Sequence, residues 1–216
     1  VGLEGEMTAI MYMQQAEGLA ANATVTVADD PDLRKKTIET SVAAAKPTYI
    51  TRELAGIDTL FGFSGEGPLV RVWPRGQVQV GAPSHPLDTL MADDQLRLEG
   101  YDLNRVKLAG GEALELILYW RPLSKLARVL KVSLRLLDTN DNPVLWPDGH
   151  PAVEDRFPLR QVALTPTWPP GELIRDVHYV PIPPDSDFQP HRLLVIAYDA
   201  QTTTEVGRWE TELPAQ

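Results

Sequence analysis

Cysteine is absent from the 216 residues of this sequence. Its absence excludes disulfide bonds, thiolate nucleophiles and zinc sites built on cysteine. Basic residues are few as well: 20 lysines and arginines stand against 30 aspartates and glutamates, which gives a formal net charge of −10. Because such a chain is repelled by nucleic acid and by an anionic membrane surface, we expect neither as a partner.

Long apolar segments are missing too. No run approaches the roughly 20 residues that a helix needs to span a bilayer. The first ten residues contain Glu4 and Glu6 without a secretory signal pattern, and the first residue is Val1 rather than methionine. We therefore expect the chain to be a piece of a longer protein, connected to a membrane only through an upstream transmembrane region.

Motifs of catalysis are a third absence. The sequence has no Gly-x-Ser-x-Gly elbow, phosphate-binding loop or dinucleotide fingerprint. The glycine-rich segment Gly62–Gly67 is not followed by a capped helix, so it cannot cradle a phosphate. The histidines lack metal-ligand spacing, and Asp138–Asn142 lacks the glycine and distal glutamate of a calcium loop, which favours a hairpin turn there. We expect a chain that is not an enzyme and that holds no cofactor and no metal.

Residues 1–74 favour a small α/β unit after an opening helix. The β-branched segment Ala23–Val27 is typical of a short strand. Asp30 followed by Pro31 is a strong helix start, and Thr48–Thr51 after that helix favours a second strand. A strand, a helix and a strand in so short a span predict a βαβ unit with parallel strands and a right-handed crossover.

Two more short strands are expected around Leu60–Phe63 and Leu69–Trp73. Regular patterning then stops, and residues 75–94 are dominated by turn-forming residue types. We interpret residues 75–94 as a linker. Within it, Gln77–Val80 alternates in polarity, so an edge strand is an open alternative for these four residues.

The hydrophobic period changes to two in the second half of the sequence. Alternation in Leu114–Tyr119 and Leu130–Leu136, with further strand-like runs at Leu173–Val180 and Leu193–Tyr198, predicts several short strands separated by turns. Residues 95–216 are therefore expected to form an antiparallel, jelly-roll-like β-sandwich, and the fold class is α+β overall. The segment Leu123–Val129 fits either the start of a strand or a helical turn.

Asp29 and Asp30 are the first candidates for a ligand site. They follow the carboxyl end of the first predicted strand, where open α/β sheets usually bind ligands. Capping of the following helix by one carboxylate, with the other solvated, explains the same residues and is the favoured interpretation.

The aromatic residues Tyr119, Trp120 and Trp168 are the second set of candidates. Such rings on a sheet surface can stack on the apolar faces of sugar rings. The favoured alternative is burial in the core, because tryptophan contributes a large apolar area and is mostly buried.

Parts of the sequence resemble a known protein family. The segments of the first half that carry the resemblance are Met11–Gly18, Lys46–Arg52 and Gly67–Val72. Those of the second half are Gly100–Leu103, Gly111–Glu112, Leu118–Trp120, Leu137–Asp138, Trp168–Glu172 and Ala197–Asp199. In this order they resemble the C-terminal soluble region of bacterial, Chloroflexus-like multi-spanning membrane proteins that are glycosyltransferase-like and related to protein O-mannosyltransferases.

The resemblance implies a place on the extracytoplasmic face of a bacterial membrane, as part of a longer protein. In such enzymes the catalytic carboxylates lie in loops of the membrane portion, so no catalytic residue is assigned to this chain. We expect a non-catalytic accessory region that positions a glycan or polypeptide acceptor. Two alternatives stay open: a structural or protein-interaction module without a small ligand, and an enzyme that uses Asp29 or Asp30.

Overall fold

The computed structural model describes residues 1–18, 22–184 and 191–213. Strands make up 43% of it and pair almost entirely in antiparallel fashion, so the fold is β-rich, with two α-helices. The helices are α1 (Glu4–Glu17) and α2 (Pro31–Ala43). Neither is long and apolar enough to cross a bilayer, and no other described segment forms such a helix.

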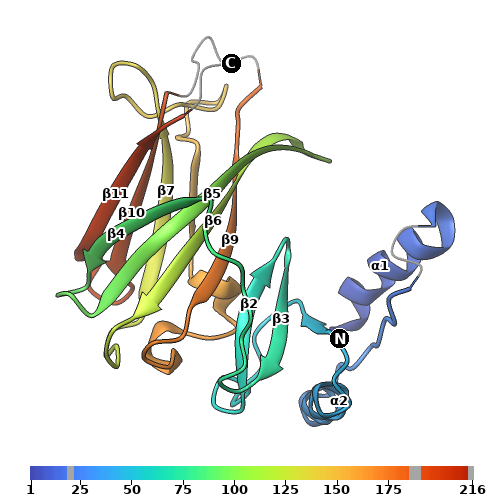
Figure 1. Ribbon diagram of the computed structural model, residues 1–216. Helices are drawn as coiled ribbons and strands as arrows, with labels where there is room; N and C mark the ends of the chain where they lie inside the picture. Colours follow the sequence, from blue (N-terminus) through green and yellow to red (C-terminus); the bar gives the residue numbers. More distant parts are fainter. Residues whose placement is uncertain (19–21, 185–190, 214–216) are drawn as a thin grey trace.

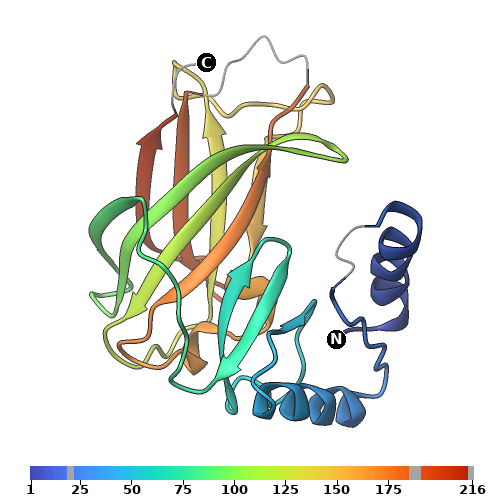
Figure 2. The ribbon, with the colours of Figure 1, turned by 45° about the vertical axis from the view of Figure 1, so that its right-hand side comes forward.

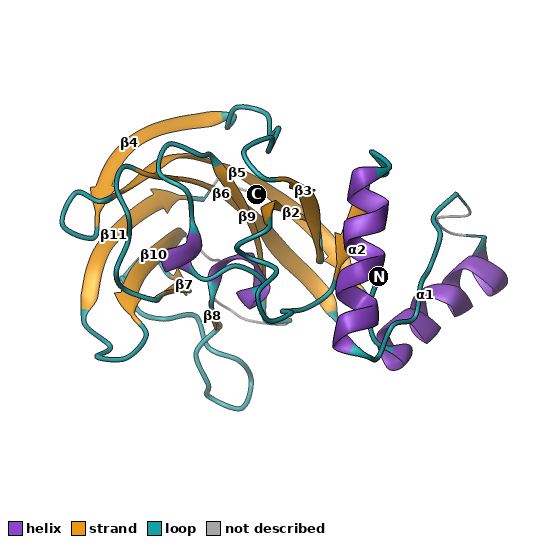
Figure 3. Cartoon of the chain, turned by 90° about the horizontal axis from the view of Figure 1, so that it is seen from below, coloured by secondary structure: helices purple, strands orange, loops and turns teal. Residues whose placement is uncertain are grey.

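A three-stranded sheet follows the helices, with the order β1-β3-β2. Its strands are β1 (Thr48–Ile50), β2 (Phe61–Glu66) and β3 (Leu69–Pro74). The β2–β3 hairpin turns at Gly67, whose φ of 57° is readily adopted by glycine. The two helices lie at one end of the molecule, beyond this sheet (Figures 1 and 3).

The predicted parallel βαβ unit is wrong. Ala23–Val27 forms no strand, apart from an isolated bridge between Gly2 and Val27, and β1 pairs antiparallel with β3. The β-branched residues of that segment have no buried face, since Thr24 and Val27 are exposed and Val25 and Thr26 are only half-buried. Strand propensity without a partner edge and a buried face does not produce a strand.

The rest of the chain forms two four-stranded antiparallel sheets. The first has the order β4-β5-β6-β9 and contains β4 (His85–Met91), β5 (Leu96–Leu108), β6 (Gly111–Pro122) and β9 (Ile174–Pro181). The second has the order β11-β10-β7-β8 and contains β7 (Leu130–Leu137), β8 (Val153–Arg156), β10 (Arg192–Asp199) and β11 (Glu205–Glu212). The strand-like runs predicted for the second half fall within β6, β7, β9 and β10, except that Leu173 precedes β9.

The predicted linker contains a strand. β4 lies within residues 75–94 and pairs with β5 from Met91↔Leu96 to His85↔Tyr101. Gln77–Val80, for which an edge strand was the alternative, is not a strand. The open segment Leu123–Val129 is neither a strand nor a helix. The burial of β4 alternates from Leu87 to Met91, but the polarity of its sequence does not, because the polar Thr89 is half-buried and the apolar Leu90 is exposed.

One continuous cluster of buried side chains joins both larger sheets to the N-terminal unit. Leu116 and Leu134 come from the two larger sheets, while Ile38 and Val70 come from α2 and β3. All four are fully buried. The first 74 residues therefore share a core with the remainder of the chain.

Strand β2 lies directly against β9. A Cβ added to Gly65 would be 3.0 Å from the backbone nitrogen of Val177 and 3.2 Å from the carbonyl oxygen of Arg175. The Arg175 guanidinium also donates to the carbonyl of Gly65. Glycine is needed here because no side chain fits between the two backbones.

The far end of the β5–β6 hairpin forms an arm that extends past its own sheet (Figures 1 and 2). The pairing of β4 with β5 stops at Tyr101, and that of β9 with β6 stops at Ala113. Leu103–Leu108 therefore pairs with β6 alone.

Candidate functional site

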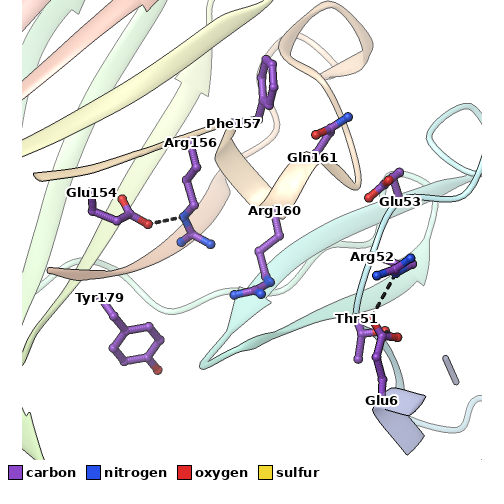
Figure 4. Close-up of a pocket in the computed structure, with 10 residues that line it drawn as sticks. All are labelled: Glu6, Thr51, Arg52, Glu53, Glu154, Arg156, Phe157, Arg160, Gln161 and Tyr179. Atoms are coloured by element: carbon purple, nitrogen blue, oxygen red, sulfur yellow. Dashed lines mark hydrogen bonds and ion pairs between the residues drawn. The ribbon is translucent and has the colours of Figure 1, made fainter. Parts of the chain in front are cut away.

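A cleft of ≈ 500 Å³ opens between the N-terminal unit and the end of the larger sheets. Its walls are formed by Glu6, Thr51, Arg52, Glu53, Glu154, Arg156, Phe157, Arg160, Gln161 and Tyr179 (Figure 4). Its volume lies in the range of roughly 300–1,000 Å³ that is usual for small-molecule sites. Three arginines give the cleft its chemical character: Arg52 of the N-terminal unit, and Arg156 and Arg160 of one later segment.

Arg52 belongs to the wall formed by the N-terminal unit. It follows β1 directly, and its Nε lies 3.0 Å from Oε1 of Glu6 in α1. Thr51 donates its hydroxyl to Oε2 of the same carboxylate at 2.5 Å. Burial alone would raise the pKa of Glu6, but the hydrogen bonds from Thr51, from a backbone amide and from Arg52 hold it below its usual value. Glu6 is therefore a carboxylate engaged within its own wall.

Arg156 belongs to the opposite wall, at the end of β8. Its Nε lies 2.5 Å from Oε1 of Glu154, and its Nη2 donates to the carbonyl of Val177. The other oxygen of Glu154 lies 2.7 Å from Nδ1 of His178, whose Nε2 lies 2.6 Å from Oδ2 of Asp176. The chain of charges from Arg156 to Asp176 links β8 of one larger sheet to β9 of the other.

His178, in the middle of this series of charged side chains, is fully buried. Burial alone would lower its pKa, but the carboxylates of Asp176 and Glu154 raise it to about 9. At neutral pH the ring is an imidazolium that donates one N–H to each carboxylate. The 3.3 Å approach of Arg156 Nε to Nδ1 is then a contact rather than a hydrogen bond, because a protonated nitrogen cannot accept.

Arg160 is positioned by an unusual turn, the 3₁₀ segment η1 (Pro158–Gln161). Leu159, Arg160 and Gln161 have φ values of 49°, 52° and 69°, in the left-handed region that costs a non-glycine residue about 1–2 kcal/mol. The turn is held by the buried Leu159, whose amide donates to Oδ1 of Asp176 at 2.8 Å.

The guanidinium of Arg160 reaches from this turn towards the middle of the cleft (Figure 4). Within the described residues it forms no hydrogen bond and no ion pair. Partial burial and the nearby charge of Arg156 both lower its pKa, against the attraction of Glu154, Glu6 and Tyr179. Arg160 thus carries a charge that is only partly compensated by groups in both walls.

Tyr179 completes the floor of the cleft. Its hydroxyl donates to Oε1 of Glu115 at 2.9 Å. Burial and this hydrogen bond raise its pKa to about 12, so the phenol stays protonated at neutral pH. A protonated phenol beside paired ions suits binding better than proton abstraction.

The aromatic residues considered as candidates for sugar stacking are buried, as the favoured interpretation predicted. Trp120 is 1% exposed, Trp168 is 3% exposed and Tyr119 is 3% exposed. Trp168 donates its indole N–H to the carbonyl of Ala163 at 3.0 Å, and Tyr119 donates its hydroxyl to Asp102 at 2.7 Å. The sugar-stacking hypothesis for these rings is wrong, because their large apolar faces are used in packing.

Asp29 and Asp30 are exposed and do not line the cleft. Asp30 accepts from the amide of Leu33 at 2.8 Å and caps α2, as the favoured interpretation predicted. Asp29 accepts from the amide of Glu4 at 2.8 Å, in the first turn of α1. Both carboxylates thus satisfy free amides at helix starts.

The cleft itself was not found from the sequence. Arg52 and Arg156 are far apart in the chain, and nothing in the sequence indicates that they face one cavity. One signal was present: Asp176 and His178 alternate with apolar residues in β9, which places two charged groups on one face of a strand. Charged residues at such positions call for partners inside the fold.

Comparisons of this chain with protein-family models, with curated proteins and with solved structures find no match.

Proposed function

We propose that this chain is a non-catalytic accessory region that holds a ligand in the cleft between its N-terminal unit and its two larger sheets. The observation that carries the proposal is the Arg160 guanidinium, which points into the cleft without an ion-pair partner among the described residues. A strained turn that presents an unpaired charge is a common feature of binding sites. The other charged pairs, Arg52–Glu6 and Arg156–Glu154, form the fixed walls around it.

In this proposal the two larger sheets are the halves of a jelly-roll-like β-sandwich, and the N-terminal part is a small α/β unit docked on one end of it. The shared core cluster supports this arrangement, since it contains side chains from both sheets. The rigid scaffold would hold the η1 turn in place and so fix the position of Arg160.

The wider setting that we propose is the extracytoplasmic part of a larger, glycosyltransferase-like membrane protein, where the cleft positions a glycan or another acceptor. The sequence resemblance supports this setting. One of its segments, Lys46–Arg52, supplies β1 together with Thr51 and Arg52 of the cleft. Another, Gly67–Val72, supplies the β2–β3 turn and most of β3, the strand that pairs with β1.

The test is a survey of cell-envelope sugars and their oligomers by NMR, in which amide shifts of the labelled chain are followed. Binding in the cleft should move the amides of Arg160, Gln161 and Thr51, whereas those of the buried Trp120 and Trp168 should change little. A panel that leaves the cleft amides unmoved would contradict the proposal.

The alternative is a protein-interaction module without a small ligand. The observation in its favour is the surface of α1, where Met11, Tyr12 and Met13 are 39%, 65% and 45% exposed. Large apolar side chains that are exposed together often mark contacts with other proteins. Replacing Tyr12 by Ser should abolish complex formation under this alternative and should leave ligand binding in the cleft unchanged under the main proposal.

A further inference from the structure

We infer that the cleft is a site for a sugar-sized ligand that carries an oxyanion, either a carboxylate or a phosphate, with Arg160 as the principal contact. This inference rests on the proposed function, because it names the chemistry of the ligand that the cleft would hold.

Most of the free hydrogen-bond donors of the cleft belong to arginines and are cationic. Arg52 uses its Nε for Glu6, and Arg156 uses its Nε and Nη2 for Glu154 and the Val177 carbonyl. Within the part of the chain that the structure describes, both Nη groups of Arg52, Nη1 of Arg156 and the whole guanidinium of Arg160 have no hydrogen-bond partner. Planar guanidinium groups bind carboxylates and phosphates through paired N–H donors, so these groups favour an oxyanion.

The charge environment of Arg160 points the same way. Arg156 lies close enough to disfavour its protonated form, and the carboxylates that offset this effect, Glu154 and Glu6, already have partners. An oxyanion between Arg156 and Arg160 would compensate both charges in a partly desolvated setting, where such interactions are strong. This cationic point lies in a chain with a net charge of −10, so it contrasts with the overall field.

The size and lining of the cleft limit the class of ligand. A volume of ≈ 500 Å³ accommodates one or two sugar rings and excludes a folded protein domain. Phe157 contributes an apolar ring, while Thr51 and Gln161 contribute a hydroxyl and an amide. An aromatic face together with polar groups is suited to a sugar ring that bears one charged substituent.

The η1 turn also favours a binding role for Arg160. Its three consecutive left-handed residues persist because Leu159 is buried and hydrogen-bonded to Asp176. A residue such as asparagine or glycine would adopt the φ of Arg160 more readily. Formation of the turn therefore does not require an arginine at this strained position, and a contact between Arg160 and an anion would account for it.

Glu53 is the opposing charge. It lines the cleft, is exposed, and has no hydrogen bond or ion pair with any other described residue. Its carboxylate must repel an incoming anion. Removal of Glu53 and removal of Arg160 should therefore change affinity in opposite directions.

The experiment is calorimetric and NMR titration of the whole chain with glucuronate, glucose 6-phosphate, inorganic phosphate and neutral glucose. Loss of a charged hydrogen bond weakens binding roughly tenfold or more, so Arg160→Asn should raise the Kd for the charged sugars by at least about tenfold. Glu53→Gln should lower the Kd several-fold. Lys125→Asn is the matched control, because Lys125 is exposed in the loop after β6 and its replacement changes the net charge by the same amount as Arg160→Asn.

Arg160→Asn should fold at least as well as the parent chain, and Arg160→Gly provides a second variant with the same tolerance for a left-handed backbone. The probes distinguish the two kinds of oxyanion. Binding of glucuronate alone would identify a carboxylate as the ligand group, and binding of glucose 6-phosphate alone would identify a phosphate. Binding of both would identify a general oxyanion site. Binding of inorganic phosphate as tight as that of glucose 6-phosphate would overturn the requirement for a sugar.

Two outcomes would overturn the inference in different ways. If neutral glucose or neutral oligosaccharides move the cleft amides and Arg160→Asn binds them like the parent chain, the proposed ligand-holding function stands and the oxyanion inference falls. If no probe moves the cleft amides, both fall together.

Discussion

His178 should make the stability of the fold fall as the pH rises from 6 to 9.5. The ring is fully buried, and its pKa in the folded chain is raised from 6.5 to about 9 by Asp176 and Glu154. Below pH 6.5 the ring is protonated in both the folded and the unfolded chain, so its stabilising contribution is complete. Between 6.5 and 9 the unfolded chain loses the proton while the folded chain keeps it, and the contribution is lost.

The magnitude follows from the two pKa values. At about 1.4 kcal/mol for each pH unit, their difference corresponds to about 3 kcal/mol of unfolding free energy. That is a large fraction of the roughly 5–15 kcal/mol that stabilises a typical domain. The change should therefore be visible as a marked shift in the urea midpoint.

The assay is urea unfolding between pH 6 and 9.5 for the parent chain, His178→Gln and His150→Gln. His150 is the control, because its side chain is 79% exposed beside Asp148. Over this range the parent chain and His150→Gln should each lose about 3 kcal/mol more than His178→Gln does. His178→Gln should lack this loss, and at pH 6.5 it should be less stable by about 3–5 kcal/mol, since Asp176 is left as a buried charge without its partner.

Comparison between variants removes the contributions of all other titrating groups, which the three chains share. An equal loss of stability with pH in His178→Gln and in the parent chain would refute the reasoning, because the pH dependence would then come from other groups. A small effect of the substitution at pH 6.5 would refute the claim that the chain of charges joins β8 to β9.

Three further predictions concern the packing. Trp168→Ala should lower the unfolding free energy by about 3–5 kcal/mol in urea titrations, because the ring is buried, and should leave ligand affinity at the cleft unchanged. A large loss of affinity with little loss of stability would contradict this. Gly65→Ala should lower the unfolding free energy by about 1–3 kcal/mol, because the added Cβ would meet the backbone of Val177. The control Gly5→Ala in α1 places a Cβ where nothing lies within 4 Å, so it should be neutral or slightly stabilising. Equal urea midpoints for the two variants would contradict the close approach of β2 and β9. Asp30→Ala should cost about 1 kcal/mol through loss of the α2 cap, measured by the same titration, and Asp30→Asn should keep most of the cap.

Four strands of the second half, β6, β7, β9 and β10, could be predicted from their strand-like apolar runs, whereas β5, β8 and β11 were not predicted. In β6, Leu114, Leu116 and Leu118 are buried on one face, and Trp120 follows them at the same spacing. Because side chains two residues apart lie on the same face of a strand, Trp120 belongs to the buried face of β6. The pattern that predicted the strand therefore also indicated that Trp120 does not stack on a sugar. Tyr119 lies on the other face, where Ile117 and Val177 form a small buried cluster with it.

Strand partners could not be predicted in the first part of the chain. Thr48–Ile50 is a strand as expected, but its partner is β3, which occurs later in the sequence, rather than Ala23–Val27 before it. Local residue types do not encode which edge a short strand will meet. The Asp30 cap was predictable for the opposite reason, since Asp30 and its partner, the Leu33 amide, lie within one helical turn.

The cleft could not be predicted because its chemistry arises from long-range packing. Arg52 and Arg160 face the same space only because β2 packs on β9 and brings the N-terminal unit against the η1 turn. A left-handed backbone at Arg160 has no signal in the sequence either, since three ordinary residues adopt it under constraint from a buried leucine and a buried carboxylate.

The arm of the β5–β6 hairpin has a consequence for how copies of this chain behave in concentrated solution. Along Leu103–Leu108, the outer edge of β5 faces no other described strand, so its backbone amides and carbonyls are a template for strand addition by a second copy. Arg105 and Lys107 are exposed along this part of β5, Arg105 being ion-paired with Glu112 of β6, and charged side chains at an edge strand disfavour such addition. Replacing both by Val should turn the arm into a site of self-association, detectable by light scattering, without any change in the core that holds the sheets together.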